Sequence, residues 1–193
     1  MKRNLVLGLV LVVAVGLVVS DTAFAQEKKV RASLKASVSQ TLGVDTVITI
    51  DFSRPGVKGR KIWGDLVPYG LNPGNKYSKD KPFPWRAGAN EKTTIEVSGD
   101  VTVDGKALPA GKYSIHMIPS EKEWIVIFNK AHEGWGSYDY DEAQDALRVK
   151  VTPVEAPFQE WFRFGFYPLA GTSAVAFLHC ENLMGPFTIA VAE

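Results

Sequence analysis

The sequence predicts an all-β protein, a jelly-roll-like antiparallel β-sandwich of about nine strands with one long ordered loop. Apolar and polar residues alternate in short runs, turn signals separate these runs, and no segment keeps the 3.6-residue period of a helix. Of 193 residues, 46% are hydrophobic, and 22 basic groups nearly balance 21 acidic groups. This composition excludes an intrinsically disordered chain and a nucleic-acid binder that works by bulk charge.

The predicted strands follow one another along the chain. One face of the first carries Val44, Thr46, Ile48, Ile50 and Phe52. Strands are also predicted at residues 93–97, 101–103, after 106, and at 113–117, 124–129, 147–151, 162–166, 174–180 and 187–191. Residues 124–129 are apolar on both faces, which predicts a central strand. Asp104-Gly105 is a hairpin turn signal, and residues 141–146 could form one helical turn at most.

The N-terminus has the three parts of a secretory signal. Lys2 and Arg3 are basic, residues 5–19 are apolar, and residues 23–25 supply the small side chains that a signal peptidase requires. We expect cleavage between Ala25 and Gln26, with an uncleaved anchor as the alternative. The expected location is periplasmic or secreted, and no other stretch is apolar enough for a membrane span.

The rest of the chain is expected to hold one domain. We predict a polar lead-in or an edge strand over residues 26–38 and a single β-sandwich over residues 39–193. Cys180 is the only cysteine, which excludes an intrachain disulfide and a multi-cysteine zinc site. No histidine pair has the spacing of metal ligands, and no phosphate loop or dinucleotide fingerprint is present. We therefore predict no metal and no cofactor.

Two loops stand out by charge and aromatic content. Residues 54–92 hold 6 of the 17 glycines and 5 of the 11 prolines, with a net charge of +6. Residues 133–145 hold five acidic and three aromatic residues and no basic one. Loops as long as the first are functional or disordered, and its aromatic residues favour packing. We expect the two loops to pack on each other, as a structural contact or around a binding cleft.

The densest polar cluster is Arg86, Asn90 and Glu91. The planar guanidinium of Arg86 could hold a carboxylate or phosphate, and Asn90 offers both a donor and an acceptor. The structural alternative pairs Arg86 with an acidic residue of the 133–145 loop and uses Asn90 to cap a turn. Indole rings in glycine-rich loops either stack on ligands or are buried. The predicted ligand-binding residues are Arg60, Trp63, Trp85, Arg86, Asn90, Glu91, Trp135 and Tyr138.

The sequence does not identify catalytic residues, although Glu91 and His116 are candidates for a general base. Ser137, His116 and Asp139 also supply the residue types of a nucleophilic triad. A triad is recognised by geometry, however, and the chain has no Gly-x-Ser-x-Gly elbow. A single histidine on a strand is more often structural than catalytic.

Several strings in these loops carry a family resemblance. They are Ser53-Arg54-Pro55, Lys58-Gly59-Arg60-Lys61-Ile62-Trp63-Gly64, Leu66-Val67-Pro68-Tyr69-Gly70, Pro84-Trp85-Arg86-Ala87-Gly88-Ala89-Asn90-Glu91, Leu108-Pro109-Ala110-Gly111-Lys112-Tyr113, Trp135-Gly136-Ser137-Tyr138 and Tyr140-Asp141-Glu142. Together they resemble the bacterial secreted family catalogued as domain of unknown function 2911, over about Ser39 to Val191. The resemblance implies one extracytoplasmic domain and no catalytic residues. It also leads us to expect a large aromatic residue where Cys180 stands.

The preferred hypothesis is an exported, non-catalytic binding module of unknown function. Its partner would be a small anionic molecule, a glycan or an envelope protein, and not nucleic acid. One alternative is a hydrolase acting at the cleft between loops 54–92 and 133–145. Another is a purely structural envelope protein. Whether the protein is an enzyme is left open, with the balance against it.

Overall fold

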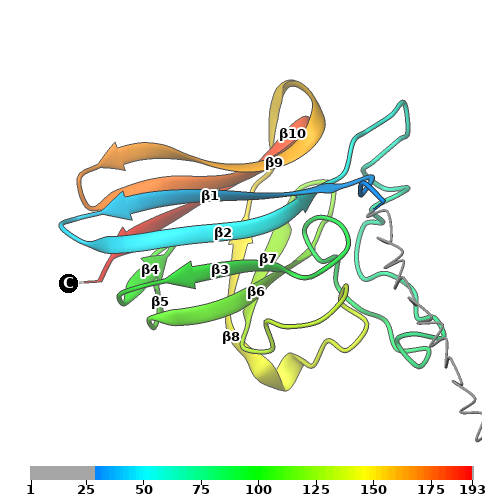
Figure 1. Cartoon of the computed structure of the whole chain (residues 1–193), viewed down its shortest axis with the longest axis horizontal. Coiled ribbons are helices and arrows are strands. Elements are labelled where there is room, and N and C mark those ends of the chain that lie inside the picture. Colours follow the sequence, from blue (N-terminus) through cyan, green and yellow to red (C-terminus); the bar gives the residue numbers. More distant parts are fainter. Residues whose placement is uncertain (1–28, 193) are drawn as a thin grey trace, which may run out of the picture. The chain divides into compact units, whose positions relative to one another are not determined.

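The computed structural model describes residues 29–192, so the predicted signal and its cleavage site at Ala25 and Gln26 lie outside the described residues. Ten strands form two antiparallel sheets (Figure 1). The strands are β1 (Leu34–Leu42), β2 (Thr46–Arg54), β3 (Thr93–Val97), β4 (Val101–Val103), β5 (Lys106–Leu108), β6 (Gly111–Ile118), β7 (Trp124–Asn129), β8 (Asp145–Val151), β9 (Val154–Ala170) and β10 (Ser173–Val191). The predicted β-sandwich is confirmed, with ten strands rather than about nine.

The two sheets differ in size and in the order of their strands. The larger sheet has six strands in the order β1-β2-β3-β6-β7-β8, and the smaller has four in the order β5-β4-β10-β9. The larger sheet is therefore a meander from which the β4–β5 hairpin leaves to join the other sheet. Among residues 29–192, a single 3-10 turn (Glu142–Gln144) lies in the segment expected to form at most one helical turn. No helix in this part of the chain has the length and apolarity needed to span a membrane.

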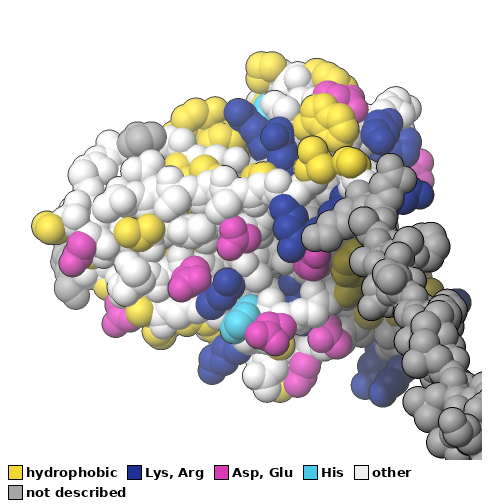
Figure 2. Space-filling view, in the orientation of Figure 1, with side chains coloured by type: hydrophobic (Ala, Val, Ile, Leu, Met, Phe, Trp, Pro, Cys, Tyr) yellow, Lys and Arg dark blue, Asp and Glu magenta, His cyan; other side chains and the backbone are white. Residues whose placement is uncertain are grey.

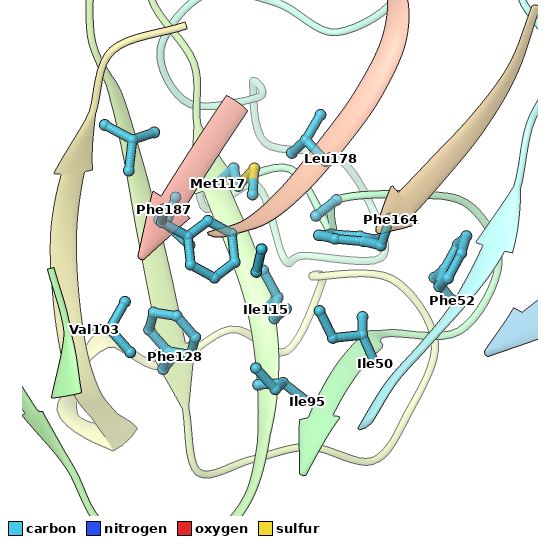
Figure 3. Packing of buried hydrophobic residues seen from close by; sticks show 14 of the residues in the cluster. Ile50, Phe52, Ile95, Val103, Ile115, Met117, Phe128, Phe164, Leu178 and Phe187 are labelled. Carbon is cyan, nitrogen blue, oxygen red and sulfur yellow. The ribbon is translucent and has the colours of Figure 1, made fainter. Parts of the chain in front are cut away.

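The hydrophobic core lies between the sheets (Figure 3). The larger sheet contributes Ile50, Ile95, Ile115, Met117 and Phe128, and the smaller contributes Val103, Phe164, Leu178 and Phe187. These are the inward positions of the alternating runs, and every second residue of a strand faces the core. The β7 strand, expected to be central, has five of its six residues buried.

Several strand boundaries differ from the sequence expectation. Val44 is 97% exposed and lies in the turn before β2, so the first predicted strand begins at Thr46. Edge strand β1 begins at Leu34, within the expected lead-in, and the compact unit begins at Arg31. The runs at 162–166, 174–180 and 187–191 belong to two long paired strands, β9 and β10. Polar or exposed residues in the added parts hid these extensions from the alternation pattern.

The long segment (residues 54–92) is ordered and closes one end of the sandwich (Figure 1). Trp85 exchanges two backbone hydrogen bonds with Met117, at 2.8 and 2.7 Å, and so pairs with β6 just beyond the position where β3 starts. The start of the segment pairs with β9, where Gly56 forms a bridge with Trp161. Its side chains Ile62, Trp63, Val67 and Ala87 join the core. Aromatic and aliphatic burial therefore stabilises a segment that contains six glycines.

Candidate functional site

The long segment and the acidic loop (residues 133–145) pack on each other, as their charges predicted. The Lys92 side chain is 1% exposed, and its ammonium group contacts Asp139 Oδ1 at 3.0 Å and Oδ2 at 3.1 Å. It also donates to the Ala131 carbonyl at 3.0 Å. The backbone N–H of Gly136 donates to the Asn90 carbonyl at 3.0 Å. A φ of +71° at Gly136, which glycine adopts readily, makes this turn possible.

A buried hydrogen-bond chain lies beneath this contact. His116 Nδ1 is 2.7 Å from Ser137 Oγ, and His116 Nε2 is 2.9 Å from Ser114 Oγ. All three residues are almost completely buried. Burial, together with the nearby Lys92 ammonium, lowers the pKa of His116 from 6.5 to about 3. The imidazole is therefore neutral at physiological pH, and it packs edge-on against Tyr140 at 5.2 Å between ring centroids.

The structure brings together two of the three triad residue types that the sequence offered. Ser137 and His116 are in hydrogen-bond contact, but Asp139 binds Lys92 instead of the imidazole. Ser114 takes the place on the far side of the ring. Ser114 and His116 lie two residues apart and face the same side of β6, a pattern that is readable from the sequence. The approach of Ser137 depends on the fold of the acidic loop and has no local signal.

Glu91, the other candidate base, is held in ion pairs. Its carboxylate lies 2.5 Å from Arg31 Nη2 and 3.4 Å from Lys35 Nζ. The hydrogen bond from Arg31 lowers the pKa of Glu91 from 4.5 to about 2. A carboxylate with so low a pKa is a poor proton acceptor near neutral pH. Glu91 lines a second cavity of about 450 Å³ together with Lys35, Asp51, Lys112 and Glu133, so that cavity mixes both charges.

Arg86 does not form the expected ion pair with the acidic loop. Its Nη1 donates to the Asn90 carbonyl at 3.0 Å, and its guanidinium carbon lies 5.8 Å from the centre of the Tyr138 ring. Within residues 29–192, no carboxylate lies within ion-pair distance of Arg86. Asn90 has a φ of +64°, and its side-chain amide donates to the Ser33 carbonyl at 3.2 Å. The Arg86 charge is thus held in place by a carbonyl and an aromatic ring.

The three loop tryptophans have different environments. Trp63 is 5% exposed, donates to the Cys180 carbonyl at 3.3 Å, and packs on Trp124 at 4.6 Å between ring centroids. Trp85 meets Trp63 edge-on at 5.7 Å and is only partly buried. Trp135 is 56% exposed, and its backbone forms a bridge with Glu91. Of the three, only Trp85 offers its side chain to the cleft described next.

A cleft of about 360 Å³ opens beside the long segment. Its apolar walls include Ile62, Val67, Phe83, Trp85 and Phe162. Its cationic residues are Lys58, Arg60 and Arg86, and the described residues that line it include no aspartate or glutamate. On the face shown in Figure 2, basic side chains gather at the end of the sandwich where the long segment lies. A volume of this size fits a small organic ligand.

The cleft lies elsewhere than the junction that the sequence suggested. The acidic loop contributes a single described residue, Ser137, and the other walls come from the long segment, Ala32, Ser33, Phe162 and Cys180. Arg60 is oriented by bonds from its Nε to the Val57 carbonyl, at 3.1 Å, and from its Nη2 to the Gly56 carbonyl. Phe162 carries no loop signature, so the sequence did not identify it as a cleft residue. Cys180, where the family resemblance led us to expect a large aromatic residue, also lines the cleft.

Other chemistry in the described residues is limited. Burial raises the pKa of Cys180 to about 12, which keeps its thiol protonated and unreactive near neutral pH. Among residues 29–192, no three His, Cys, Asp or Glu side chains gather as a metal site. The cleft therefore offers fixed positive charge and apolar walls, and its lining includes Ser137, which is 2% exposed.

Comparison with known proteins identifies a family. Neither the curated proteins nor the solved structures include a match to this chain. The sequence model of the family described as Protein of unknown function (DUF2911) matches residues 33–189, which include residues of all ten described strands and every described cleft residue except Ala32. The chain belongs to this family, as the loop strings predicted.

Proposed function

We propose that the protein is a binding module for a small organic anion with an apolar or aromatic body, held in the cleft. One observation carries this proposal. Lys58, Arg60 and Arg86 line a single apolar-walled cleft, and no described lining residue is acidic. A carboxylate, sulfonate or phosphate would pair with these cations, since guanidinium groups bind such anions through paired N–H donors.

The walls favour a compact ligand with an apolar body over a glycan. The rings of Trp85 and Phe162 meet edge-on with 5.7 Å between their centroids. Phe162 belongs to the hydrophobic core and Trp85 packs against that core, so the cleft wall here is apolar. Trp135, the most exposed of the predicted stacking residues, is absent from the cleft lining. Binding would bury the ligand's apolar part at about 25 cal/mol per Å² of area removed from water. The N-terminal pattern supports export, so we place this binding in the periplasm or outside the cell.

The test is a fluorescence titration with 8-anilinonaphthalene-1-sulfonate, an aromatic sulfonate. Its uncharged analogue N-phenyl-1-naphthylamine measures the apolar contribution alone. We expect saturable 1:1 binding of the sulfonate and weaker binding of the neutral analogue. Arg60→Gln should weaken sulfonate binding about tenfold, because a hydrogen bond to a charged group contributes about 1.5 kcal/mol or more.

The matched control is Lys112→Gln. Lys112 is also an exposed cation, but it lies outside the cleft and pairs with Glu96 at 3.6 Å. Its replacement should leave sulfonate affinity unchanged. Equal affinity for the charged and neutral probes, or equal effects of the two substitutions, would reject the proposal. Absence of any binding would favour the structural alternative, in which the loops only stabilise the fold.

A further inference from the structure

The hydrogen-bond chain around His116 fixes where its protons lie. Ser114 Oγ is 3.1 Å from the Ala131 carbonyl and 3.3 Å from the Asn129 carbonyl. Carbonyl oxygens only accept, so the single hydroxyl proton of Ser114 goes to one of them. Ser114 must then accept from His116, whose Nε2 carries the ring proton. His116 Nδ1 is therefore unprotonated, and it accepts a hydrogen bond from the hydroxyl group of Ser137.

This arrangement leaves Ser137 Oγ with its lone pairs available and its proton directed at a base. Ser137 is 2% exposed, yet it lines the cleft that contains the three cations. The Arg86 guanidinium lies against the preceding residue, where a Cβ on Gly136 would come within 3.0 Å of Arg86 Nη1. Arg86 and Ser137 line the same cleft, so negative charge that develops on a substrate there would be favoured by the positive charge of Arg86.

We propose that Ser137 is a nucleophile toward small anionic esters in this cleft, with His116 Nδ1 as its general base. The Ser137 oxygen forms a bond to the ester carbonyl carbon while its proton moves to Nδ1. The carbon–oxygen bond to the leaving alkoxide breaks, and the alkoxide takes the proton from His116. Water then hydrolyses the acyl-serine by the same proton transfers. This proposal rests on the proposed function only in that the cleft admits an organic anion.

The surroundings of His116 indicate that nucleophilic attack by Ser137 would be slow. Lys92 lies near the imidazole and disfavours its protonated form, whereas Asp139 favours it. Ser114 holds the ring proton where a classical triad has a carboxylate. The imidazole is neutral, as a base must be, but with a pKa of about 3 it is, like Glu91, a weak proton acceptor near neutral pH. A highly electrophilic probe is therefore the appropriate first test.

The experiment is labelling of the protein with diisopropyl fluorophosphate, followed by intact mass and peptide mapping. The Ser137 oxygen would form a bond to phosphorus, the phosphorus–fluorine bond would break, and the proton would leave through His116. We expect a single adduct on Ser137 that is absent from Ser137→Ala and at least tenfold slower in His116→Gln. Ser78→Ala is the control, because Ser78 is also buried but does not line the cleft.

Two outcomes would overturn the proposal. One is wild-type protein that gains no adduct, and the other is an adduct that persists in Ser137→Ala. If His116→Gln fails to fold, the Ser137→Ala comparison still decides, since this change removes one oxygen from a small side chain. Binding of 8-anilinonaphthalene-1-sulfonate is measured on the same samples. Sulfonate binding without labelling rejects the nucleophile and keeps the binding module, so the two proposals fail separately.

Discussion

Replacing Asp139 with asparagine tests whether the interloop contact stabilises the fold. Lys92 is 1% exposed and has two close partners, the Asp139 carboxylate and the Ala131 carbonyl. Removing one partner of a fully buried ion pair costs about 3–5 kcal/mol. Asp139 is 62% exposed, and an asparagine oxygen could still accept from Lys92, so the expected loss is smaller. We expect Asp139→Asn to lower the free energy of unfolding by about 1–3 kcal/mol.

The assay is urea denaturation followed by tryptophan fluorescence, with the midpoint and slope compared with wild type. Glu96→Gln is the matched control. Its partner Lys112 lies 3.6 Å away and both side chains are exposed, so this pair contributes about 0–1 kcal/mol. An Asp139→Asn effect no larger than that of Glu96→Gln would refute the reasoning that the buried Lys92 depends on the acidic loop.

Three other predictions follow from single residues. Between pH 6.5 and 3 His116 is protonated in the unfolded chain but not in the folded protein, so the free energy of unfolding should fall as pH falls. His116→Gln removes this contribution, so its urea midpoint should depend less steeply on pH between pH 6.5 and 5. Lys58 has a φ of +50°, which glycine adopts more readily, so Lys58→Gly should raise the thermal midpoint or leave it unchanged. The same change removes a cation from the cleft and should weaken sulfonate binding. A clear loss of thermal stability would contradict this prediction. A Cβ on Gly185 would lie 2.6 Å from the buried Trp124 ring, so Gly185→Ala should cost about 1–3 kcal/mol in urea denaturation, whereas Gly171→Ala, which meets no neighbouring atom, should cost little.

The fold was predictable where one face of a strand is buried and the other is not. Ile48, Ile50 and Phe52 show this in β2, and their inward placement follows from the two-residue period. The same rule failed at Val44, because an apolar residue in a tight turn continues the alternation by chance. It could not decide between a lead-in and an edge strand before residue 39, because the side chains of β1 are largely exposed or half-buried.

The site was less predictable because its contacts join residues far apart in the chain. The pairing of Glu91 with Arg31 spans 60 residues, and the Ser137–His116 bond spans 21. Composition suggested that the basic and acidic loops would meet, but it could not assign Lys92, rather than Arg86, to the acidic partner. Phe162 and Cys180 of the cleft wall come from β9 and β10, and the alternation of Phe162 with its neighbours predicted a strand but not a cleft.

The most direct test of the central claim, that the cleft holds an organic anion, is an NMR titration of the tryptophan indole N–H signals. The chain has five tryptophans, and Trp85→Phe assigns the signal of the one whose ring lines the cleft. The account predicts that 8-anilinonaphthalene-1-sulfonate shifts the Trp85 signal in a saturable manner and leaves that of the exposed Trp135 unchanged. A shift of Trp135 with no change at Trp85 would show that the anion binds elsewhere and would contradict the account.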